Sequence, residues 1–124
     1  SIFGCNESRV SGDCTPISDA VVDLWHADAE GSYSESSEPY LRGMQVTDAD
    51  GITQFDTIYP GAYQGRTVHI HAEVHLDNST ALTTQLYFAG DPYNAKDPWI
   101  VDSLVMKHRE VKGVRRAAFD FVIA

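Results

Sequence analysis

Apolar and polar residues alternate in short runs along most of this chain, with the two-residue period of β-strands and not the longer period of helices. These runs are rich in β-branched and aromatic residues, which favour strands. We therefore expect strands over residues 20–27, 41–47, 52–58, 66–76, 81–88 and 115–123. Turn signals lie between them at Asp48-Ala49-Asp50-Gly51, Pro60-Gly61 and Asp77-Asn78-Ser79. The pattern predicts an all-β fold, an antiparallel β-sandwich.

The stretch from 90 to 110 is less regular than the rest of the chain. Pro92 and Pro98 exclude a central strand there, because proline cannot donate to a sheet ladder. A short helix is expected over 99–107. No linker, repeat or low-complexity tract divides the chain, so we expect a single domain over residues 1–124.

Acidic residues outnumber basic residues by 18 to 9, which gives a formal net charge of -9. This charge repels phosphate backbones and anionic headgroups, so we expect neither nucleic acid nor an acidic membrane as a partner. The chain has no apolar run of about 18 residues and does not open on a basic and then apolar leader. It is expected to be soluble and, if secreted, already processed.

Cys5 and Cys14 are separated by a polar segment that contains glycines. Such a segment can close into a hairpin that brings the thiols together, and a bridge there would suit an oxidising compartment. Two isolated thiols in a cytoplasmic protein are the alternative. The cysteines therefore leave a secreted or extracytoplasmic location and a cytoplasmic one both open.

His69 and His71 are the most informative residues of the chain. In a strand, residues i and i+2 share one face, so both imidazoles would present to the same point, as in half of a metal site. The alternative is that they lie on a solvated strand face. His75 is too far along the strand for a shared mononuclear site and is expected at the surface or in a supporting role.

Two further histidines carry other expectations. His26 follows Trp25 at the end of the first strong strand pattern, and a structural, hydrogen-bonded histidine is expected there. His108 lies between Lys107 and Arg109, which indicates a solvated, charged position.

The remaining ligands of a His69 and His71 site would decide its metal. A third histidine or a carboxylate would indicate zinc, ferrous iron or manganese, whereas a phenolate oxygen suits a trivalent ion such as Fe(III). Tyrosines crowd the loops before the histidine strand, at Tyr33, Tyr40, Tyr59 and Tyr63. Each tyrosine alone is more often a packing residue, but several of them converge on this region.

In order along the chain, these motifs resemble the intradiol ring-cleavage dioxygenases, the non-haem Fe(III) enzymes that open catechols. The matching segments are 22–34 (VDLWHADAEGSYS), 41–51, 55–63 (FDTIYPGAY), 66–71 (RTVHIH), 84–88 and 90–92. The ordered set of Trp-His-Ala, Gly-x-Tyr, Pro-Gly-x-Tyr and His-x-His is highly specific, although no single piece would suffice.

The resemblance implies an all-β, prealbumin- or transthyretin-like antiparallel β-sandwich with a loop-borne metal site. It implies that Tyr33, Tyr63, His69 and His71 ligate one non-haem Fe(III). The tyrosine of the Pro-Gly-x-Tyr turn, Tyr63, would be the ligand that leaves when substrate arrives. The chain would then be the catalytic core domain of such an enzyme.

The resemblance also implies roles around the metal. Arg66 would stabilise negative charge that develops on the substrate ring, Gln85 would lie near the ring, and Trp25 would form part of the pocket wall. The implied reaction uses O2 to cleave a catecholic ring between its two hydroxyl-bearing carbons, which gives a cis,cis-muconate-type product.

Two departures bear on substrate and compartment. Only five residues separate Tyr63 from His69, a short connection that is similar to that of compact, secreted members of the family. The N-terminal extension of other relatives is missing, so the chain is expected to be a trimmed core. Neither the preferred catechol derivative nor the oligomeric state follows from the sequence.

Two alternatives need no tyrosine ligand. One is a non-enzymatic, transthyretin-like β-sandwich module for binding, which would share the turn at 48–51 and the corner at 60–61. The other is a cupin-like His-x-His site that uses Glu73 or His75 with a divalent metal.

Overall fold

The computed structural model describes residues 1–5, 14–28, 42–62, 66–77 and 79–123. Within these residues nearly all regular structure is strand, and the only helical elements are two short 3-10 turns. The elements in chain order are β1 (Ile2–Cys5), β2 (Cys14–Pro16), β3 (Val21–Trp25), β4 (Arg42–Val46), β5 (His69–Leu76), β6 (Ser79–Phe88), η1 (Asn94–Lys96), η2 (Asp102–Leu104), β7 (Val105–Met106), β8 (His108–Val111), β9 (Val114–Ala117) and β10 (Phe121–Ile123).

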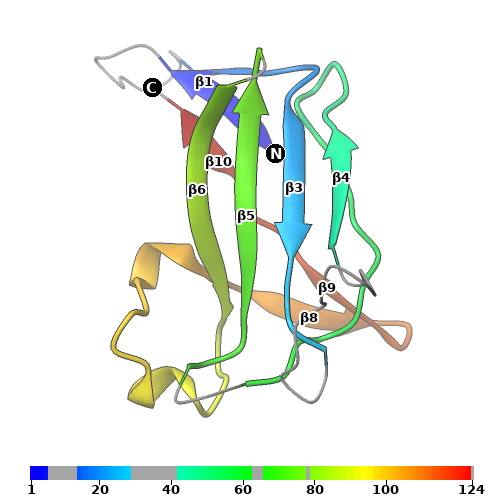
Figure 1. Ribbon diagram of the computed structural model, residues 1–124. Helices are drawn as coiled ribbons and strands as arrows, with labels where there is room; N and C mark the ends of the chain where they lie inside the picture. Colours follow the sequence, from blue (N-terminus) through cyan, green and yellow to red (C-terminus); the bar gives the residue numbers. More distant parts are fainter. Residues whose placement is uncertain (6–13, 29–41, 63–65, 78, 124) are drawn as a thin grey trace, which may run out of the picture.

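A five-stranded sheet in the order β4-β3-β5-β6-β7 forms the main layer (Figure 1). Its pairs are antiparallel except for the parallel pair of β6 with β7. One face is apolar because alternate residues of the central strands point inward, among them Val22, Ile70 and Leu86. The other face carries the histidines of β5. The main sheet therefore has the apolar core on one face and the histidines on the other.

A second, three-stranded sheet in the order β10-β1-β2 covers the apolar face (Figure 1). Ile2 from β1 and Phe121 from β10 belong to the same buried cluster as the inward residues of the main sheet. β1 and β10 are parallel, so the first described residues are held beside the last ones. Burial of apolar side chains between these two layers is the main stabilising term of the fold.

Gly51 closes the turn that leads toward this second sheet. Its φ is +73°, and a Cβ built there would lie 2.6 Å from the carbonyl oxygen of Ile2. Its own carbonyl accepts a 2.8 Å hydrogen bond from the amide of Ile2. Only glycine fits both the backbone conformation and the close approach, so the turn predicted at 48–51 also anchors β1.

The all-β expectation is confirmed, with four of the six expected strands in place as β3, β4, β5 and β6. Residues 52–58 form no regular strand, and the single strand expected over 115–123 is two, β9 and β10. The helix expected over 99–107 is wrong, because only the short η2 and then β7 occupy that stretch. The described part of the sheet is open, with β4 and β7 at its edges, which does not support a cupin-like barrel.

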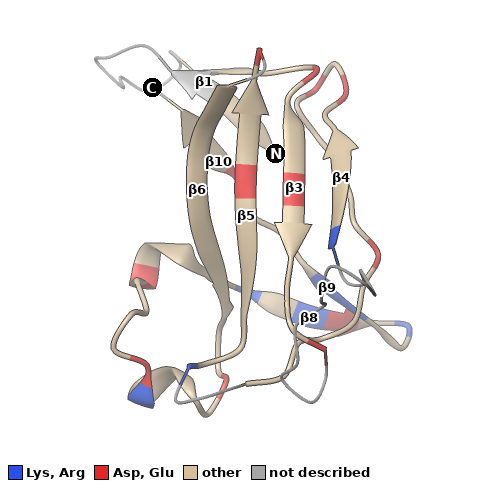
Figure 2. Cartoon of the chain, viewed as in Figure 1, with Lys and Arg blue, Asp and Glu red and all other residues tan. Residues whose placement is uncertain are grey.

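Charge is unevenly distributed over the molecule. Basic residues gather on and around the β8-β9 hairpin, whereas acidic residues recur along the sheet and its loops (Figure 2). Among the described residues, no helix has the length and apolar character that crossing a bilayer requires.

Candidate functional site

The two imidazoles of β5 lie together at the start of that strand. The ring centroids of His69 and His71 are 4.8 Å apart and the ring planes are nearly perpendicular. Register places His69 opposite Tyr87 and His71 opposite Gln85 on β6. His69 is 2% exposed, so the alternative of two solvated histidines on a strand face is wrong for this residue.

A backbone hydrogen bond orients the His69 ring. Its Nδ1 lies 2.8 Å from the carbonyl oxygen of Thr67, which has no proton, so Nδ1 donates and Nε2 carries the ring lone pair. Metal-binding histidines are commonly oriented in this way by a hydrogen bond from the other ring nitrogen.

Both imidazoles are held in the neutral form. Burial lowers the pKa of His69, and the charge of Arg66 acts in the same direction against the opposing hydrogen bond to Thr67. Burial also lowers the pKa of His71 to about 4, with further lowering by His69 and Arg66. Neutral imidazole is the form that binds a metal ion.

Trp25 fixes the second ring by stacking. The rings of Trp25 and His71 are nearly parallel, 5° apart in plane, with centroids separated by 5.1 Å. The two residues are paired in the β3-β5 register, so the contact follows from the sheet itself. The guanidinium of Arg42 lies 4.8 Å from the centroid of the Trp25 ring. Trp25 therefore contacts a candidate ligand directly, a more specific position than the pocket wall that was expected.

Arg66 enters the site just before β5. Its Nε donates to Asp97 Oδ2 at 2.9 Å, and its Nη2 donates to Gln85 Oε1 at 2.5 Å. The Arg66 side chain is 17% exposed and that of Asp97 is fully buried, so this is an ion pair in a largely dry environment. The structure thus brings together Arg66, Gln85 and the two histidines, which the family resemblance assigns to one site.

Asp97 is one of two site residues that the sequence analysis did not identify. Its Oδ2 also accepts a 2.8 Å hydrogen bond from the Thr67 amide, and its Oδ1 accepts one of 2.7 Å from the Trp99 amide. Burial by itself would raise the pKa of Asp97, but the hydrogen bonds from these amides and from Arg66 outweigh it and lower the pKa below its ordinary value. The carboxylate is therefore charged at neutral pH.

Tyr87 was also missed, and it joins β6 to the loop that follows η1. Its hydroxyl lies 3.2 Å from Gln85 Oε1 and 3.1 Å from the Trp99 carbonyl oxygen, so its single proton serves one acceptor at a time. The pairing of Tyr87 with His69 could have identified it as a site residue, because directly opposed residues of an antiparallel pair are neighbours.

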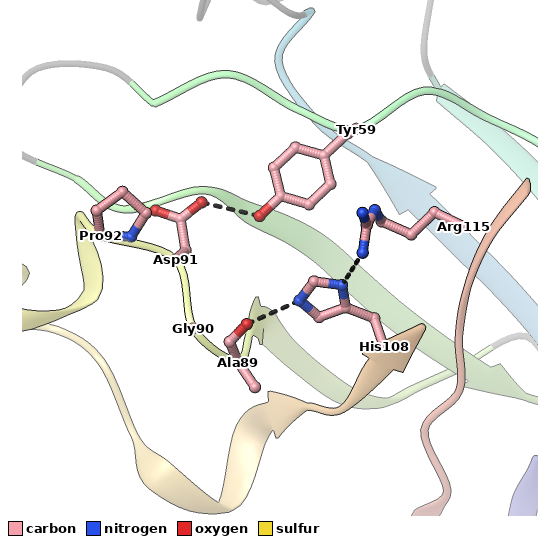
Figure 3. Close-up of a pocket in the computed structure, with 7 residues that line it drawn as sticks. All are labelled: Tyr59, Ala89, Gly90, Asp91, Pro92, His108 and Arg115. Atoms are coloured by element: carbon pink, nitrogen blue, oxygen red, sulfur yellow. Dashed lines mark hydrogen bonds between the residues drawn. The ribbon is translucent and has the colours of Figure 1, made fainter. Parts of the chain in front are cut away.

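The candidate tyrosines divide into two groups. Tyr33, Tyr40 and Tyr63 lie outside the described residues. Tyr59 is described, and it donates a 2.8 Å hydrogen bond to Asp91 Oδ2 and packs on Phe88. It lines a separate cavity of about 300 Å³, shown with its other lining residues in Figure 3.

The other histidines lie outside the His69 and His71 pair. His26 is buried, with Nδ1 on the Ala27 carbonyl oxygen at 2.6 Å and Nε2 accepting from the Thr57 hydroxyl at 2.7 Å, which confirms its structural role. The expectation of a solvated His108 is wrong. Its Nε2 donates to the Ala89 carbonyl oxygen and its Nδ1 accepts from Arg115 (Figure 3). Its ring also packs edge-on to Phe88.

This arrangement fits a metal ion that accepts imidazole nitrogen. Two neutral, oriented imidazoles supply two adjacent ligands, and imidazole suits iron, zinc, copper and nickel. A fixed guanidinium beside them can stabilise negative charge on a bound molecule, more strongly because the environment is partly dry.

Comparison with known proteins adds a family match over most of the chain. The profile of the family described as Dioxygenase matches residues 8–124. The chlorocatechol 1,2-dioxygenase of Rhodococcus opacus is 36% identical over 107 residues, which cover 67% of this chain and 42% of that protein. Catechol 1,2-dioxygenase 2 of Acinetobacter lwoffii is 34% identical over 138 residues, with 90% of this chain and 50% of that protein covered. The chain thus spans about half the length of these relatives.

Solved structures agree with the sequence matches. The dioxygenase domain of a dioxygenase and carbohydrate-binding protein fusion from Streptomyces sp. SirexAA-E matches with a TM-score of 0.86 and 38% identity, over 98% of this chain and 74% of that one. Catechol 1,2-dioxygenase from Pseudomonas arvilla C-1 matches with a TM-score of 0.76 and 28% identity, over 98% of this chain and 49% of that one.

We expect Asp97→Asn to destabilise the protein, because it leaves the largely buried Arg66 guanidinium without its counter-ion. The loss of unfolding free energy at pH 7 should be about 3 kcal/mol. In the parent, the lowered pKa of Asp97 stabilises the fold above the ordinary carboxyl pKa, and this contribution is lost as the pH falls below about 4. The variant should lack that part of the pH dependence. Urea unfolding at pH 7 and between pH 5 and pH 3 measures both effects.

The exposed Asp50→Asn is the matched control, and it should change the unfolding free energy by less than about 0.5 kcal/mol. Equal unfolding free energies for Asp97→Asn and the parent would contradict the assignment of a buried ion pair.

Proposed function

The chain belongs to the intradiol ring-cleavage dioxygenase family, and we propose that it cleaves the ring of catecholic substrates between the two hydroxyl-bearing carbons. O2 is the second substrate, and both of its atoms enter a cis,cis-muconate-type product. The observation that carries the proposal is the pair of oriented, neutral imidazoles beside a guanidinium fixed by Asp97 and Gln85.

We propose Fe(III) as the resident metal, held by His69, His71, Tyr33 and Tyr63. His69 and His71 fit this role because both are neutral and clustered, and because His69 presents Nε2 as its lone-pair nitrogen. Tyr33 and Tyr63 are assigned as ligands from the family resemblance. Their phenolates would supply the hard, anionic oxygens that favour a trivalent ion. When bound, Fe(III) supplies Lewis acidity toward the two catechol oxygens and so favours their deprotonation.

The protein's own groups supply the remaining steps. Tyr63 is proposed to accept a catechol proton at its phenolate oxygen, which makes it both a ligand and a base. Arg66 is proposed to stabilise negative charge on the ring during attack by O2. Its guanidinium is held on one side by Asp97 and on another by Gln85, so it does not need to reorganise when charge develops.

Trp25 and Gln85 are proposed to shape the pocket from opposite sides of β5. Trp25 keeps the His71 ring in one orientation by stacking, and Gln85 holds Arg66 near the imidazoles. A non-enzymatic β-sandwich would need neither a stacked His71 nor a buried Arg66, so these contacts favour the enzyme over that alternative.

We propose a disulfide between Cys5 and Cys14 and, with it, an extracytoplasmic location. The antiparallel β1-β2 register places the two residues directly opposite each other, and Cα atoms of such pairs are about 4.5 to 5.5 Å apart, within the range that a disulfide spans. No cysteine is free in the part of the chain that the structure describes. Disulfides persist in oxidising compartments, which links the bridge to the location.

The visible spectrum of the iron-loaded protein tests the metal assignment. Tyrosinate bound to Fe(III) gives an intense charge-transfer band, so we expect a red-brown protein whose band changes when catechol is added without O2. Tyr33→Phe and Tyr63→Phe should each weaken or shift the band. The exposed Tyr93→Phe is the matched control and should leave the band unchanged. A colourless protein that binds no iron would contradict the metal assignment.

Arg66→Lys separates the role of Arg66 from metal binding. Lysine keeps a positive charge but lacks the planar fork that reaches Asp97 and Gln85 together. We expect the visible band to persist while kcat for catechol falls roughly 100-fold. Turnover at the parent's rate would show that the role given to Arg66 is wrong.

Alkylation followed by mass measurement tests the bridge. Without reductant the unfolded chain should take up no thiol reagent, and after reduction both cysteines should react. Cys14→Ser is the control, since it leaves Cys5 reactive without reduction. Full alkylation of the parent without reductant, in protein expressed in an oxidising compartment, would contradict the disulfide.

A further inference from the structure

A second group of metal-binding side chains lies on the histidine-bearing face of the main sheet, farther along β5. Asp23 of β3 is paired in register with Glu73 of β5, and His75 is the next residue of β5 on the same face. One ligand atom from each of the three residues lies within 4.8 Å of the other two. The acidic positions of β3 and β5 lie side by side in the middle of the sheet (Figure 2).

Asp23 carries a buried carboxylate oxygen that has no hydrogen-bond partner among the described residues. Its side chain is only 3% exposed, and Oδ2 pairs with Arg42 Nη2 at 3.1 Å. Its Oδ1 is buried and makes no hydrogen bond within the described part of the chain. A buried carboxylate oxygen without a donor is costly, and a bound cation is one way to satisfy it.

Glu73 and His75 already have the spacing of two ligands on one ion. Glu73 Oε2 lies 3.3 Å from His75 Nε2. Two tetrahedral ligands of Zn²⁺ at their usual bond lengths are about 3.4 Å apart. Both side chains are 28% exposed, so an ion can reach them from solvent.

A hydrogen bond on the other nitrogen of His75 supports the same assignment. His75 Nδ1 lies 3.2 Å from the Thr80 hydroxyl oxygen. The hydroxyl can accept from Nδ1 or donate to it, so His75 can turn Nε2 into the lone-pair nitrogen when an ion takes the place of the Nε2–H contact with Glu73. The β5-β6 register shifts between Val74 and His75, but the extra residue there is Ala81 of β6, so β5 keeps its two-residue period through His75.

We propose that Asp23, Glu73 and His75 form a site for a divalent transition-metal ion, with Zn²⁺ as the probe. One imidazole and two carboxylates are a ligand set that zinc accepts, and three protein ligands leave a further position for water. The ion would join β3 to β5 at mid-length and stabilise the folded state. The site uses none of the proposed iron ligands, so it does not depend on the proposed dioxygenase activity.

Calorimetric titration of Zn²⁺ into the iron-loaded full chain tests the site. We expect one Zn²⁺ per chain, no loss of iron, and a higher Tm with Zn²⁺ than without. Glu73→Gln and His75→Gln should each weaken binding at least 10-fold, because each removes a ligand. Both positions are partly exposed, so the variants are expected to fold. Asp23→Asn should weaken it as well.

Two further variants locate the ion. Glu110→Gln removes one exposed negative charge on β8 and is the matched control, with unchanged affinity expected. His69→Ala/His71→Ala should still bind one Zn²⁺ with the parent's affinity. Absence of Zn²⁺ binding in the parent, unchanged affinity in Glu73→Gln, or loss of binding in the His69→Ala/His71→Ala variant would each overturn the proposal. The first two results would show that Glu73 and His75 form only an ion pair. The third would show that Zn²⁺ binds at His69 and His71.

Discussion

The carboxylate of Asp97 is the contact on which the geometry of the site depends. It accepts hydrogen bonds from the Arg66 side chain and from the amides of Thr67 and Trp99. Trp99 lies in the loop after η1, whereas Arg66 and Thr67 lie just before β5. One buried carboxylate therefore links two segments that are about thirty residues apart. A carboxylate that accepts several amide and guanidinium hydrogen bonds is stable when buried, whereas an unpaired one is not.

The candidate ligands follow from this anchor. Thr67 is held at its amide by Asp97, and its carbonyl accepts from the ring of His69. The order β3-β5-β6 then places Trp25 on one side of His71 and Gln85 on the other. The Thr67 hydrogen bond and the Trp25 stack orient the two imidazoles, and burial in the same place lowers their pKa values and keeps them neutral.

The sequence predicted the parts of the site that depend on local period. His69 and His71 share a face because a strand has a two-residue repeat. The alternation of apolar and polar residues was strong enough to predict both β5 and β6 as strands. Asp97 could not be found in this way. It lies in an irregular loop, and its contacts with Arg66 and Thr67 bridge about thirty residues, a separation to which no periodic pattern extends.

The errors in the fold prediction have the same physical origin. Residues 52–58 have a strand-like composition, but a strand also needs a partner for its backbone groups, and no described strand pairs with them. β1 was missed because it is short and pairs in parallel with β10, at the other end of the chain. Such pairing depends on tertiary packing and not on local propensity.

The product formed from catechol under isotopically labelled O2 distinguishes intradiol cleavage from every alternative. We expect cis,cis-muconate that carries label from both atoms of O2. A product cleaved beside the diol instead of between its hydroxyl-bearing carbons, or no ring cleavage by the iron-loaded chain, would contradict it.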